Sequence, residues 1–496
     1  KTFMLYYEIL AGHPEMQTAL IFKEQKMTYG QLRESIERRA NFLQAKGLQK
    51  GDRVGLLSKN CADFVISYFA VIRAGGVVVP FNFQLAPREI AYIVKDAGIN
   101  LMIARQKIDL TEALQEIDYA GLVQFDFVEM EEPIEHEFID HELHEDDNCT
   151  IIYTSGTTGK PKGAMLSHKN LVANNREFTA VVTMSAEDIG LCVLPMYHCF
   201  AWTVSVSGPL FYGACIVIQE TYIFKDTMGL IAKHEVNFFA GVPTMIQLFF
   251  KGAEAHELAN IRCFISGGAP LPQVLAEGFR KKFGKPVQEG YGLSEASPVV
   301  TVNPASKVKV GSIGPSLPGV IVMIQDEDGK EMKRGEVGEL CVRGDNVMLG
   351  YLNLPEETAG ALRGDWLHTG DLAYKDEDGY VFIVDRLKDM IISSGENIYP
   401  REIEEALYTH PLIEEAAVIG IPDKLRGQAV CAYMVLTEGA ALEKKELRKY
   451  LMERIAPYKV PREFFFCVQL PKNSTGKILK TALREQALID MVSRKR

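Results

Sequence analysis

Residues 150–163 read T-I-I-Y-T-S-G-T-T-G-K-P-K-G, an apolar, strand-like stretch that runs directly into a loop of small, hydroxyl-bearing and cationic residues. Phosphate binding requires backbone N–H groups that converge on an anion, short hydroxyl donors and positive charge. The loop supplies all three through Thr154, Ser155, Gly156, Thr157, Thr158, Gly159, Lys160 and Lys162. It is not a Walker A motif, because no G-K-S or G-K-T follows at the required spacing. We therefore predict a phosphate-binding loop, with an ordinary Gly/Ser/Thr surface loop as the alternative.

Helix-like and strand-like patterns alternate on both sides of this loop. An amphipathic helix capped by Thr28 is expected from Thr28 to Lys46, and a second helix from Asn60 to Ala74. Strands are expected at Arg53–Leu57, Gly76–Pro80, Asn100–Ala104, Ile189–Pro195, Cys215–Gln219, Phe238–Val242 and Arg262–Ser266. Short apolar, β-branched runs separated by helices indicate parallel sheet built from crossover units.

The pattern changes to short strands and turns from about Gly311. Asp-Gly pairs within 326–330 and 375–380 predict hairpins. After Asp385 we expect a helix at Pro400–His410, strands at Glu415–Ile421 and Ala429–Leu436, and a helix at Lys444–Ile455. This compact α+β unit has the size of a small domain. We therefore place a domain boundary near Asp385, which divides the chain into residues 1–384 and 385–496.

The charge of the chain is concentrated in one segment. The 496 residues include 54 Lys and Arg against 65 Asp and Glu, a net charge of −11. Asp126–Asp147 holds 11 acidic residues and no Lys or Arg, so the remainder is balanced at 54 against 54. Without a basic excess, a nucleic-acid or anionic-membrane binder is disfavoured. We expect the acidic segment to be a solvated connector.

Cysteine usage and hydropathy predict a cytoplasmic protein. Nine scattered cysteines without a C-x-x-C pair favour buried thiols in a reducing compartment. The first residues show no basic stretch followed by a long apolar run, so we expect no secretory signal. The run Ile189–Gln219 carries no charge and is long enough to span a bilayer, but Pro195, Gly208 and Pro209 interrupt it. We expect a buried strand, a loop, a core helix and another strand there.

The loop Tyr153–Gly163 resembles the signature of the adenylate-forming (AMP-binding) superfamily, and further motifs follow in the family's order as far as Lys477. This superfamily includes acyl-CoA synthetases, 4-coumarate ligases, firefly luciferase and peptide-synthetase adenylation domains. The resemblance implies an α/β fold: a large N-terminal domain of mainly parallel sheets sandwiched by helices, a small β-barrel-like subdomain, and a small mobile α+β C-terminal domain. It also implies ATP and Mg²⁺ as cofactors and CoA as co-substrate.

Four motifs that resemble those of the family imply a nucleotide site. S-G-G-A-P-L at 266–271 places Gly268, Ala269 and Pro270 against the adenine. E-G-Y-G-L-S-E at 289–295 implies ATP contacts from Glu289, Gly290, Tyr291, Gly292 and Ser294, with Tyr291 stacked on the base. Ser294 stands where the family commonly has Thr, which keeps the hydroxyl. Glu295 and Thr154 would hold Mg²⁺, a cation that prefers oxygen ligands. Asp371, in T-G-D, would accept the ribose hydroxyls, and Arg386 would contact ribose and phosphate.

The C-terminal motifs imply the catalytic lysine and the CoA contacts. An acid that attacks the α-phosphate brings two anions together, so a cation between them lowers the barrier. Lys477, in P-K-N-S-T-G-K at 471–477, matches the family's catalytic lysine, and we count Glu295 and His198 among the catalytic residues as well. Lys388 matches the interdomain hinge. Ser394, Gly395 and Glu396 resemble the strip that lines the pantetheine tunnel, where glycine lets the thiol arm approach the backbone.

The substrate acid is predicted from the stretch P-M-Y-H-C-F-A-W at 195–202. No acidic residue follows this stretch until Glu220. Nothing here pairs a substrate amine, so the pocket is apolar. Its expected residues are Cys199, Trp202, Gly241, Val242 and Pro243. Trp202 matches a gating tryptophan of long-chain fatty acyl-CoA synthetases, with an ordinary core tryptophan as the alternative.

We therefore predict an ATP-dependent CoA ligase of medium- to long-chain fatty acids. An acyl-AMP ligase that loads a carrier protein, an aryl-acid CoA ligase and a non-catalytic nucleotide-binding regulatory protein stay open as alternatives. The expected partners are small molecules (fatty acid, ATP and CoA), without nucleic acid and with at most peripheral membrane contact. A homodimer is left open.

Overall fold

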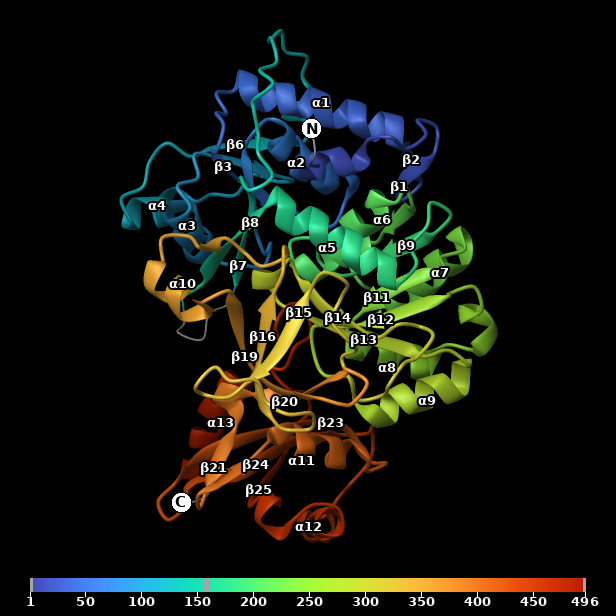
Figure 1. Cartoon of the computed structure of the whole chain (residues 1–496), viewed down its shortest axis with the longest axis vertical. Coiled ribbons are helices and arrows are strands. Elements are labelled where there is room, and N and C mark those ends of the chain that lie inside the picture. Colours follow the sequence, from blue (N-terminus) through green and yellow to red (C-terminus); the bar gives the residue numbers. More distant parts are fainter. Residues whose placement is uncertain (1–2, 155–159, 494–496) are drawn as a thin grey trace.

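The computed structural model describes residues 3–154 and 160–493 (Figure 1). Most of the chain forms an upper body that contains two mainly parallel sheets and an antiparallel one, and the residues after β20 form a smaller α+β unit below it. The predicted fold class is confirmed for the described residues. The bulk of the core lies in the upper body, and the small unit has apolar clusters of its own.

The first parallel sheet is built mainly from residues 189–302. Parallel pairs run from β1 through β10, β9, β11 and β12 to β13, and an antiparallel strand closes each end. Its order is β14 (Val299–Val302), β13 (Val287–Gly292), β12 (Cys263–Ser266), β11 (Phe238–Gly241), β9 (Ile189–Cys192), β10 (Cys215–Ile218), β1 (Thr18–Phe22) and β2 (Gln25–Thr28). Each predicted strand of this region is present.

The second sheet contains the strand that precedes the phosphate loop. Its order is β17 (Gly350–Tyr351), β8 (Lys162–Ser167), β7 (Asn148–Thr154), β4 (Val77–Pro80), β3 (Arg53–Leu57), β5 (Leu101–Ala104) and β6 (Val123–Asp126). The β7–β4–β3–β5–β6 pairs are parallel, whereas β7 and β8 form an antiparallel hairpin around residues 155–161. The predicted phosphate loop therefore connects two paired strands.

Helices cover both sheets, and α2 is buried along most of its length. A helix that is apolar all round belongs in a core rather than at a surface. In α1 the Thr28 side chain accepts from Gln31 N, which confirms the predicted cap, and the Gln31 side chain completes a capping box. The helices are α1 (Tyr29–Ala45), α2 (Ala62–Arg73), α3 (Pro87–Asp96), α4 (Thr111–Glu116), α5 (His168–Val181), α6 (Gly208–Phe211), α7 (Phe224–His234), α8 (Pro243–Gly252), α9 (Gln273–Phe283), α10 (Pro355–Ala361), α11 (Pro400–Tyr408), α12 (Lys444–Met452) and α13 (Lys480–Ser493).

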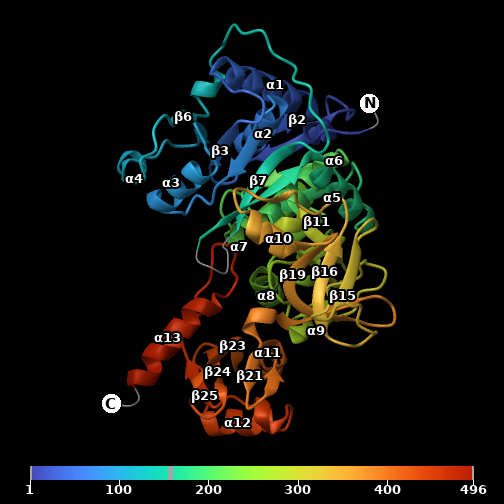
Figure 2. The ribbon, with the colours of Figure 1, turned by 60° about the vertical axis from the view of Figure 1, so that its left-hand side comes forward.

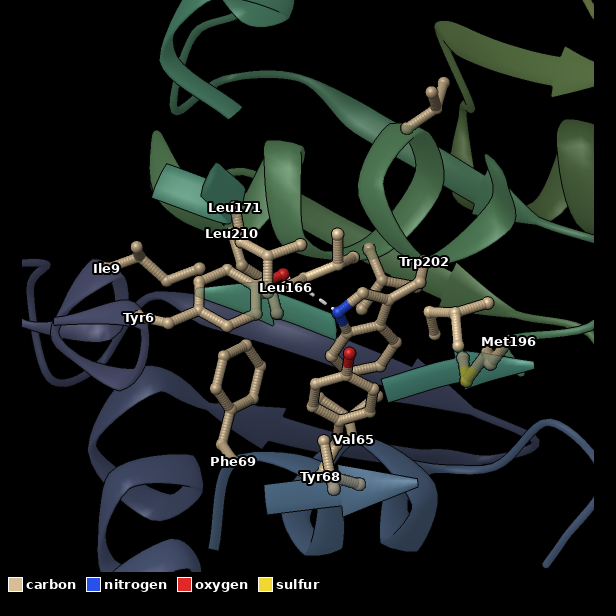
Figure 3. Packing of buried hydrophobic residues seen from close by; sticks show 14 of the residues in the cluster. Tyr6, Ile9, Val65, Tyr68, Phe69, Leu166, Leu171, Met196, Trp202 and Leu210 are labelled. Carbon is tan, nitrogen blue, oxygen red and sulfur yellow. Dashed lines mark hydrogen bonds between the residues drawn. The ribbon is translucent and has the colours of Figure 1, made fainter. Parts of the chain in front are cut away.

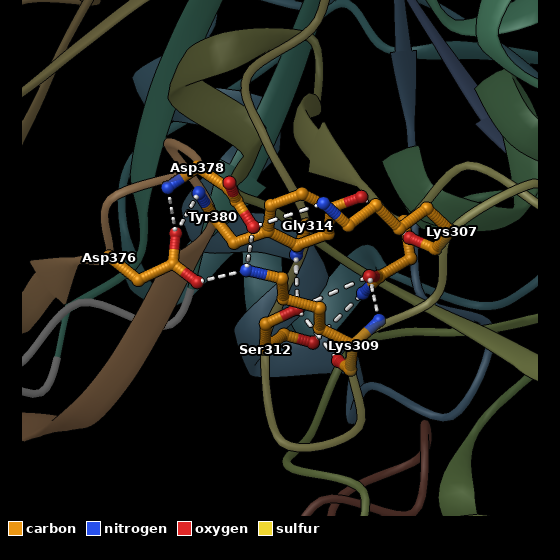
Figure 4. A network of polar contacts seen from close by, with 8 residues as sticks. Lys307, Lys309, Ser312, Gly314, Asp376, Asp378 and Tyr380 are labelled. Carbon is orange, nitrogen blue, oxygen red and sulfur yellow. Dashed lines mark hydrogen bonds and ion pairs between the residues drawn. The ribbon is translucent and has the colours of Figure 1, made fainter.

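A five-stranded antiparallel sheet follows, in the order β15 (Ile321–Gln325), β16 (Gly338–Arg343), β19 (Trp366–Lys375) and β18 (Leu362–Arg363), with β20 (Val381–Arg386) also paired to β19. The predicted Asp-Gly hairpin joins β19 to β20. Figure 4 shows how its turn is anchored: Lys309 Nζ donates to Asp376 Oδ2 at 2.5 Å and to Asp378 Oδ2 at 2.6 Å, and Tyr380 Oη donates to the Lys307 carbonyl at 2.6 Å. The anchored turn fixes one end of the hairpin, and the other end carries Asp371 and Arg386.

The C-terminal unit begins after β20, close to the boundary expected at Asp385. Its sheet has the order β22 (Glu396–Ile398), β21 (Ile391–Ser393), β24 (Gly427–Leu436) and β23 (Ile413–Asp423), with β25 (Glu463–Phe466) paired to β24. Figure 2 shows the segment between β25 and α13 extending from this unit up to the upper body. That segment contains Lys477.

The uncharged run 189–219 folds as β9, a π-helix at Ala201–Ser207, α6 and β10. Among the described residues, no helix combines the length and the apolar character needed to cross a membrane. All nine cysteines lie in the described ranges and none is in a disulfide; eight of them are buried. The predictions of buried thiols and of a core segment are confirmed.

The acidic segment has little regular structure, and most of its residues are exposed or half-buried, as expected of a solvated connector. It passes over α1 and α2 (Figure 1), and two of its carboxylates pair with arginines of these helices. Arg39, only 1% exposed, donates to Glu131 Oε1 at 2.6 Å, and Arg73 Nη1 lies 2.9 Å from Asp140 Oδ1. Met130 is buried. The segment is therefore a largely solvated connector that also supplies counter-charges to these two arginines.

Candidate active site

The described residues next to the phosphate loop bring three predicted site residues together. Ser155, Gly156, Thr157, Thr158 and Gly159 lie outside the described residues. Thr154 ends β7 and pairs with Lys162 at the start of β8, and Lys162 Nζ lies 4.6 Å from the ring centroid of Tyr351. The Tyr351 hydroxyl donates to Glu295 Oε1 at 2.9 Å. Lys162 and Glu295 are therefore linked through Tyr351, which no sequence pattern had indicated, and Thr154 joins them through its pairing with Lys162.

The oxygen atoms of this group suit a hard cation. Thr154 offers a hydroxyl and Glu295 a carboxylate, the ligand types that Mg²⁺ prefers, and Mg²⁺ usually completes its shell with water and substrate phosphates. The donor set therefore fits Mg²⁺ held between Glu295 and a bound nucleotide. The contact itself stays a prediction.

The predicted adenine turn follows β12. Gly268 has φ +80°, a conformation that glycine adopts without strain. Just before it, the Ser266 hydroxyl is buried and has no hydrogen-bond partner among the described residues. Below the turn, Glu289 accepts the Leu271 N–H at 3.2 Å, and burial raises the pKa of Glu289 to about 7. The Glu289 carboxylate thus supports the turn, and its direct contact with ATP stays a prediction.

The two predicted ribose residues lie together at the end of the β19–β20 hairpin. Asp371 and Arg386 are register partners, and Arg386 Nε lies 3.4 Å from Asp371 Oδ1. The Tyr291 hydroxyl donates to Asp371 Oδ2, and burial together with this carboxylate raises the pKa of Tyr291. Tyr291 and Arg386, 95 positions apart in the sequence, therefore meet at the Asp371 carboxylate.

Lys477 reaches this group from the C-terminal unit. Ser474 anchors its loop on the upper body, because Tyr197 Oη donates to Ser474 Oγ at 2.6 Å and Asn82 Nδ2 does so at 3.3 Å. The pKa of Lys477 is lowered to about 8, first by burial and then by the Arg386 guanidinium, while Asp371 acts in the opposite direction. The structure therefore places Lys477 beside the predicted ribose and phosphate residues.

His198 is a neutral imidazole next to Lys477. Burial and the Lys477 ammonium lower the pKa of His198 to about 4. Its Nδ1 accepts the Phe200 N–H at 3.2 Å, so in the neutral ring the proton is assigned to Nε2. His198 can therefore donate one hydrogen bond to an anion without carrying a charge.

Residues of the predicted acyl pocket adjoin the same site. Cys199 Sγ lies 3.1 Å from Ser294 Oγ, and burial raises the pKa of Cys199 to about 12, so the thiol stays protonated. Gly241 ends β11, Val242 caps α8, and Pro243 is its first residue. A Cβ placed on Gly476 would lie 3.7 Å from Val242 Cγ2. The lysine loop thus packs against the wall that we predicted for the acid.

Comparison with known proteins identifies the family. The family model described as AMP-binding enzyme matches residues 8–352, and the model described as AMP-binding enzyme C-terminal domain matches residues 402–477. The chain belongs to the AMP-binding enzyme family. It is 37% identical to a long-chain-fatty-acid–CoA ligase of Bacillus subtilis, over 95% of this chain and 92% of that protein. It is 36% identical to a feruloyl-CoA synthase of an Amycolatopsis species, over 93% and 94%.

Solved structures support the same assignment. ATP-bound MatB from Rhodopseudomonas palustris superposes with a TM-score of 0.91 at 32% identity, over 97% of this chain and 99% of that one. An o-succinylbenzoate CoA synthetase from Bacillus subtilis, in complex with ATP and magnesium, gives a TM-score of 0.86 at 32% identity, over 97% and 98%. The chain is therefore an enzyme of the adenylate-forming CoA ligase family, whose relatives differ in the acid that they activate.

Trp202 lies in the hydrophobic core of this AMP-binding enzyme (Figure 3). The side chain is 2% exposed, its Nε1 donates to Tyr6 Oη at 2.9 Å, and its ring stacks on Tyr68 with a centroid distance of 3.8 Å. A buried indole N–H that finds a partner is typical of a packed core. The structure accords with the core alternative, and a gating role for Trp202 stays a prediction.

The predicted CoA strip is not part of this cluster. Ser394, Gly395 and Glu396 are exposed on the turn between β21 and β22. In both Figure 1 and Figure 2, β21 lies in the lower unit, well away from β7. Lys388, the predicted hinge, lies in a short 3-10 helix, Leu387–Asp389, between the two bodies. The structure therefore assembles the predicted adenylation residues and leaves the CoA residues outside.

Proposed function

We propose that this enzyme activates a medium- to long-chain fatty acid with ATP and transfers the acyl group to CoA. In the first half-reaction a carboxylate oxygen attacks the α-phosphorus of ATP, the bond to pyrophosphate breaks, and acyl-AMP forms. In the second, the CoA thiol loses its proton, its sulfur attacks the acyl carbon, and AMP leaves with the electrons of the broken C–O bond. The products are acyl-CoA, AMP and pyrophosphate.

The position of Lys477 carries this proposal. Two unit charges about 4 Å apart interact by about 4 kcal/mol at an effective dielectric constant near 20, so carboxylate and phosphate repel strongly unless a cation lies between them. Lys477 belongs to the C-terminal unit, yet its surroundings are Arg386, Asp371 and Lys388. An ammonium between the two anions stabilises the charge that develops during attack.

Mg²⁺ would assist in the same place. Glu295 and Thr154 would hold it with hard oxygen atoms. When bound, the ion neutralises phosphate charge. The Nε2–H of neutral His198 would donate to an oxygen of the reacting acid or phosphate and orient it.

The apolar residues of the predicted acid pocket support a fatty acid as substrate. Val242, Met245 and Cys199 are all buried. The stretch from Ile189 to Gln219 contributes no charged side chain. A substrate with an amine or a second carboxylate would need a counter-charge there. An aryl acid is the second candidate, because a feruloyl-CoA synthase is among the similar proteins.

A panel of acids tests the choice of substrate. Each methylene buried in an apolar tunnel contributes about 0.8 kcal/mol, so kcat/KM should rise about fourfold per methylene along a series of linear acids until the tunnel is filled. The measurement is CoA-dependent AMP release with saturated acids of increasing length, with ferulate and benzoate as matched aryl acids. A preference for the aryl acids would replace the fatty acid, and acyl-AMP release without use of CoA would favour the carrier-protein alternative.

The lowered pKa of Lys477 predicts a pH dependence. The protonated lysine is the active form, so kcat/KM for pyrophosphate release should fall as pH rises through about 8, more than two units below an ordinary lysine. Bound ATP adds negative charge and so raises the pKa of Lys477. The fall of kcat should therefore occur at a higher pH than the fall of kcat/KM. Both profiles come from pyrophosphate release between pH 6 and 10. A kcat/KM that stays constant up to pH 10 would contradict this role of Lys477.

A rotation of the C-terminal unit completes the proposed cycle. After acyl-AMP forms, Lys477 would leave and the exposed strip Ser394–Glu396 would turn toward the acyl group. Ser394 and Gly395 have φ of +53° and +81°, so this turn has the tight geometry over which an extended thiol arm can pass. Lys388 would be the pivot.

A further inference from the structure

The strand that carries Asp371 contains a bulge at this residue. β16 and β19 pair through Glu339 with Leu372 and through Cys341 with His368. Between these pairs lie one residue of β16 and three residues of β19, 369–371. Such a bulge bends a strand and changes the direction of its side chains. The path of the bulge therefore decides where the Asp371 carboxylate lies.

Both oxygen atoms of the Glu339 carboxylate accept hydrogen bonds, one from the bulge and one from His368, the residue before it. Oε1 accepts the Gly370 N–H at 3.1 Å, and Oε2 accepts from His368 Nδ1 at 2.9 Å, which assigns the proton to that nitrogen because an ionised carboxylate only accepts. Gly370 has φ +73°, which suits glycine. Thr369 Oγ1 donates to the Leu340 carbonyl at 2.7 Å and accepts the Asp371 N–H at 3.1 Å. Every residue of the bulge is thus tied to β16 directly or through Thr369.

A metal ion is the other arrangement that this cluster suggests. Glu339, Cys341 and His368 each offer one ligand atom, and these atoms lie within 4.8 Å of one another. Arg363 Nη2, however, lies 3.4 Å from Glu339 Oε2, where it would oppose a cation. Both Glu339 oxygens already have donors from β19. Hydrogen bonding therefore accounts for the cluster.

We propose that Glu339 is a positioning residue for the nucleotide. It holds the bulge 369–371 so that the Asp371 carboxylate faces the two ribose hydroxyls, without touching the nucleotide itself. The proposal rests on the proposed function, because the ribose contact of Asp371 belongs to it. Glu339 lies outside the motifs quoted in the sequence analysis, so it was not among the predicted site residues.

The test compares two nucleotides that differ only in the groups which Asp371 would bind. Binding of ATP and of 2′,3′-dideoxy-ATP to the full-length enzyme is measured by calorimetry for wild type and for Glu339→Gln, which keeps one acceptor oxygen instead of two. We expect Glu339→Gln to weaken ATP about tenfold and dideoxy-ATP less than threefold. Equal losses for both nucleotides, or no loss for either, would overturn the proposal, as would equal binding of both nucleotides to wild type.

Three further variants complete the design. Glu336→Gln changes an exposed carboxylate of the same segment and should leave both affinities unchanged. His368→Gln retains a donor toward Glu339, whereas His368→Ala removes it. Only the alanine variant should therefore bind ATP more weakly while its affinity for dideoxy-ATP changes little. This pair keeps the test decisive if Glu339→Gln does not fold. Failure of the proposed function would be seen separately, as wild type that releases no pyrophosphate with any acid although the binding comparison still holds.

Discussion

Lys477→Ala should lower acid-dependent pyrophosphate release by about 10²–10³-fold, the loss expected when a single charge-stabilising group is removed from a reacting site. The same variant should convert supplied acyl-AMP and CoA to acyl-CoA at close to the wild-type rate. The reason is that Lys477 lies within electrostatic range of Asp371 and Arg386 in this structure, in a loop that Ser474 bonds to the upper body. The two half-reactions are measured separately, as pyrophosphate release and as thioester formation.

Lys472→Ala is the matched control for this prediction. Lys472 belongs to the same loop, but its ammonium lies against Glu415 in the C-terminal unit. Its removal should change both half-reactions less than threefold. If Lys477→Ala slowed both half-reactions equally, the lysine would not be specific to adenylation.

Lys388→Pro should slow thioester formation by about 100-fold or more while adenylation falls less than tenfold. Lys388 is the middle residue of the 3-10 helix Leu387–Asp389. Proline fixes φ near −65°, which lies within the range of a 3-10 helix, so we expect the short helix to accept it while rotation about φ of this residue is prevented. The measurement is again the pair of isolated half-reactions.

Lys388→Ala separates the loss of rotation from the loss of the side chain. Alanine removes the ammonium that lies near Lys477 but leaves φ free, so thioester formation should stay within a few-fold of wild type. An unchanged second half-reaction in Lys388→Pro would remove the case for a pivot at this residue.

Local patterns in the sequence predicted the elements well because each depends on neighbouring residues. The Thr28 cap, strand β3 at Arg53–Leu57 and the Asp-Gly hairpin between β19 and β20 all follow from capping, β-branched runs or turn chemistry within a few positions. Burial of the uncharged run was predicted from its prolines and glycines. The motifs of the family also gave Asp371, Arg386 and Lys477, which the structure brings together.

Features that depend on distant partners could not be predicted from local patterns. The ion pairs of the acidic segment were not expected because its partners, Arg39 and Arg73, lie on helices more than 50 positions earlier. Tyr351 and Glu339 have no local signature, and their hydrogen bonds to Glu295 and Gly370 exist only in the folded chain. The sequence left Trp202 open between a gate and a core tryptophan, and its stacking on Tyr68 depends on the position of α2 in the folded chain.

The amino-acid sequence by itself determined the alternation of strands and helices, the phosphate-loop chemistry and the identity of the candidate reactive groups, because propensity and charge are properties of each residue and its neighbours. Only the tertiary structure decided that the lysine loop of the C-terminal unit lies against Asp371 and Arg386 while the strip Ser394–Glu396 points to solvent. The physical reason is that the position of the lysine loop depends on contacts between the two bodies, such as Tyr197 with Ser474, which join residues far apart in the sequence.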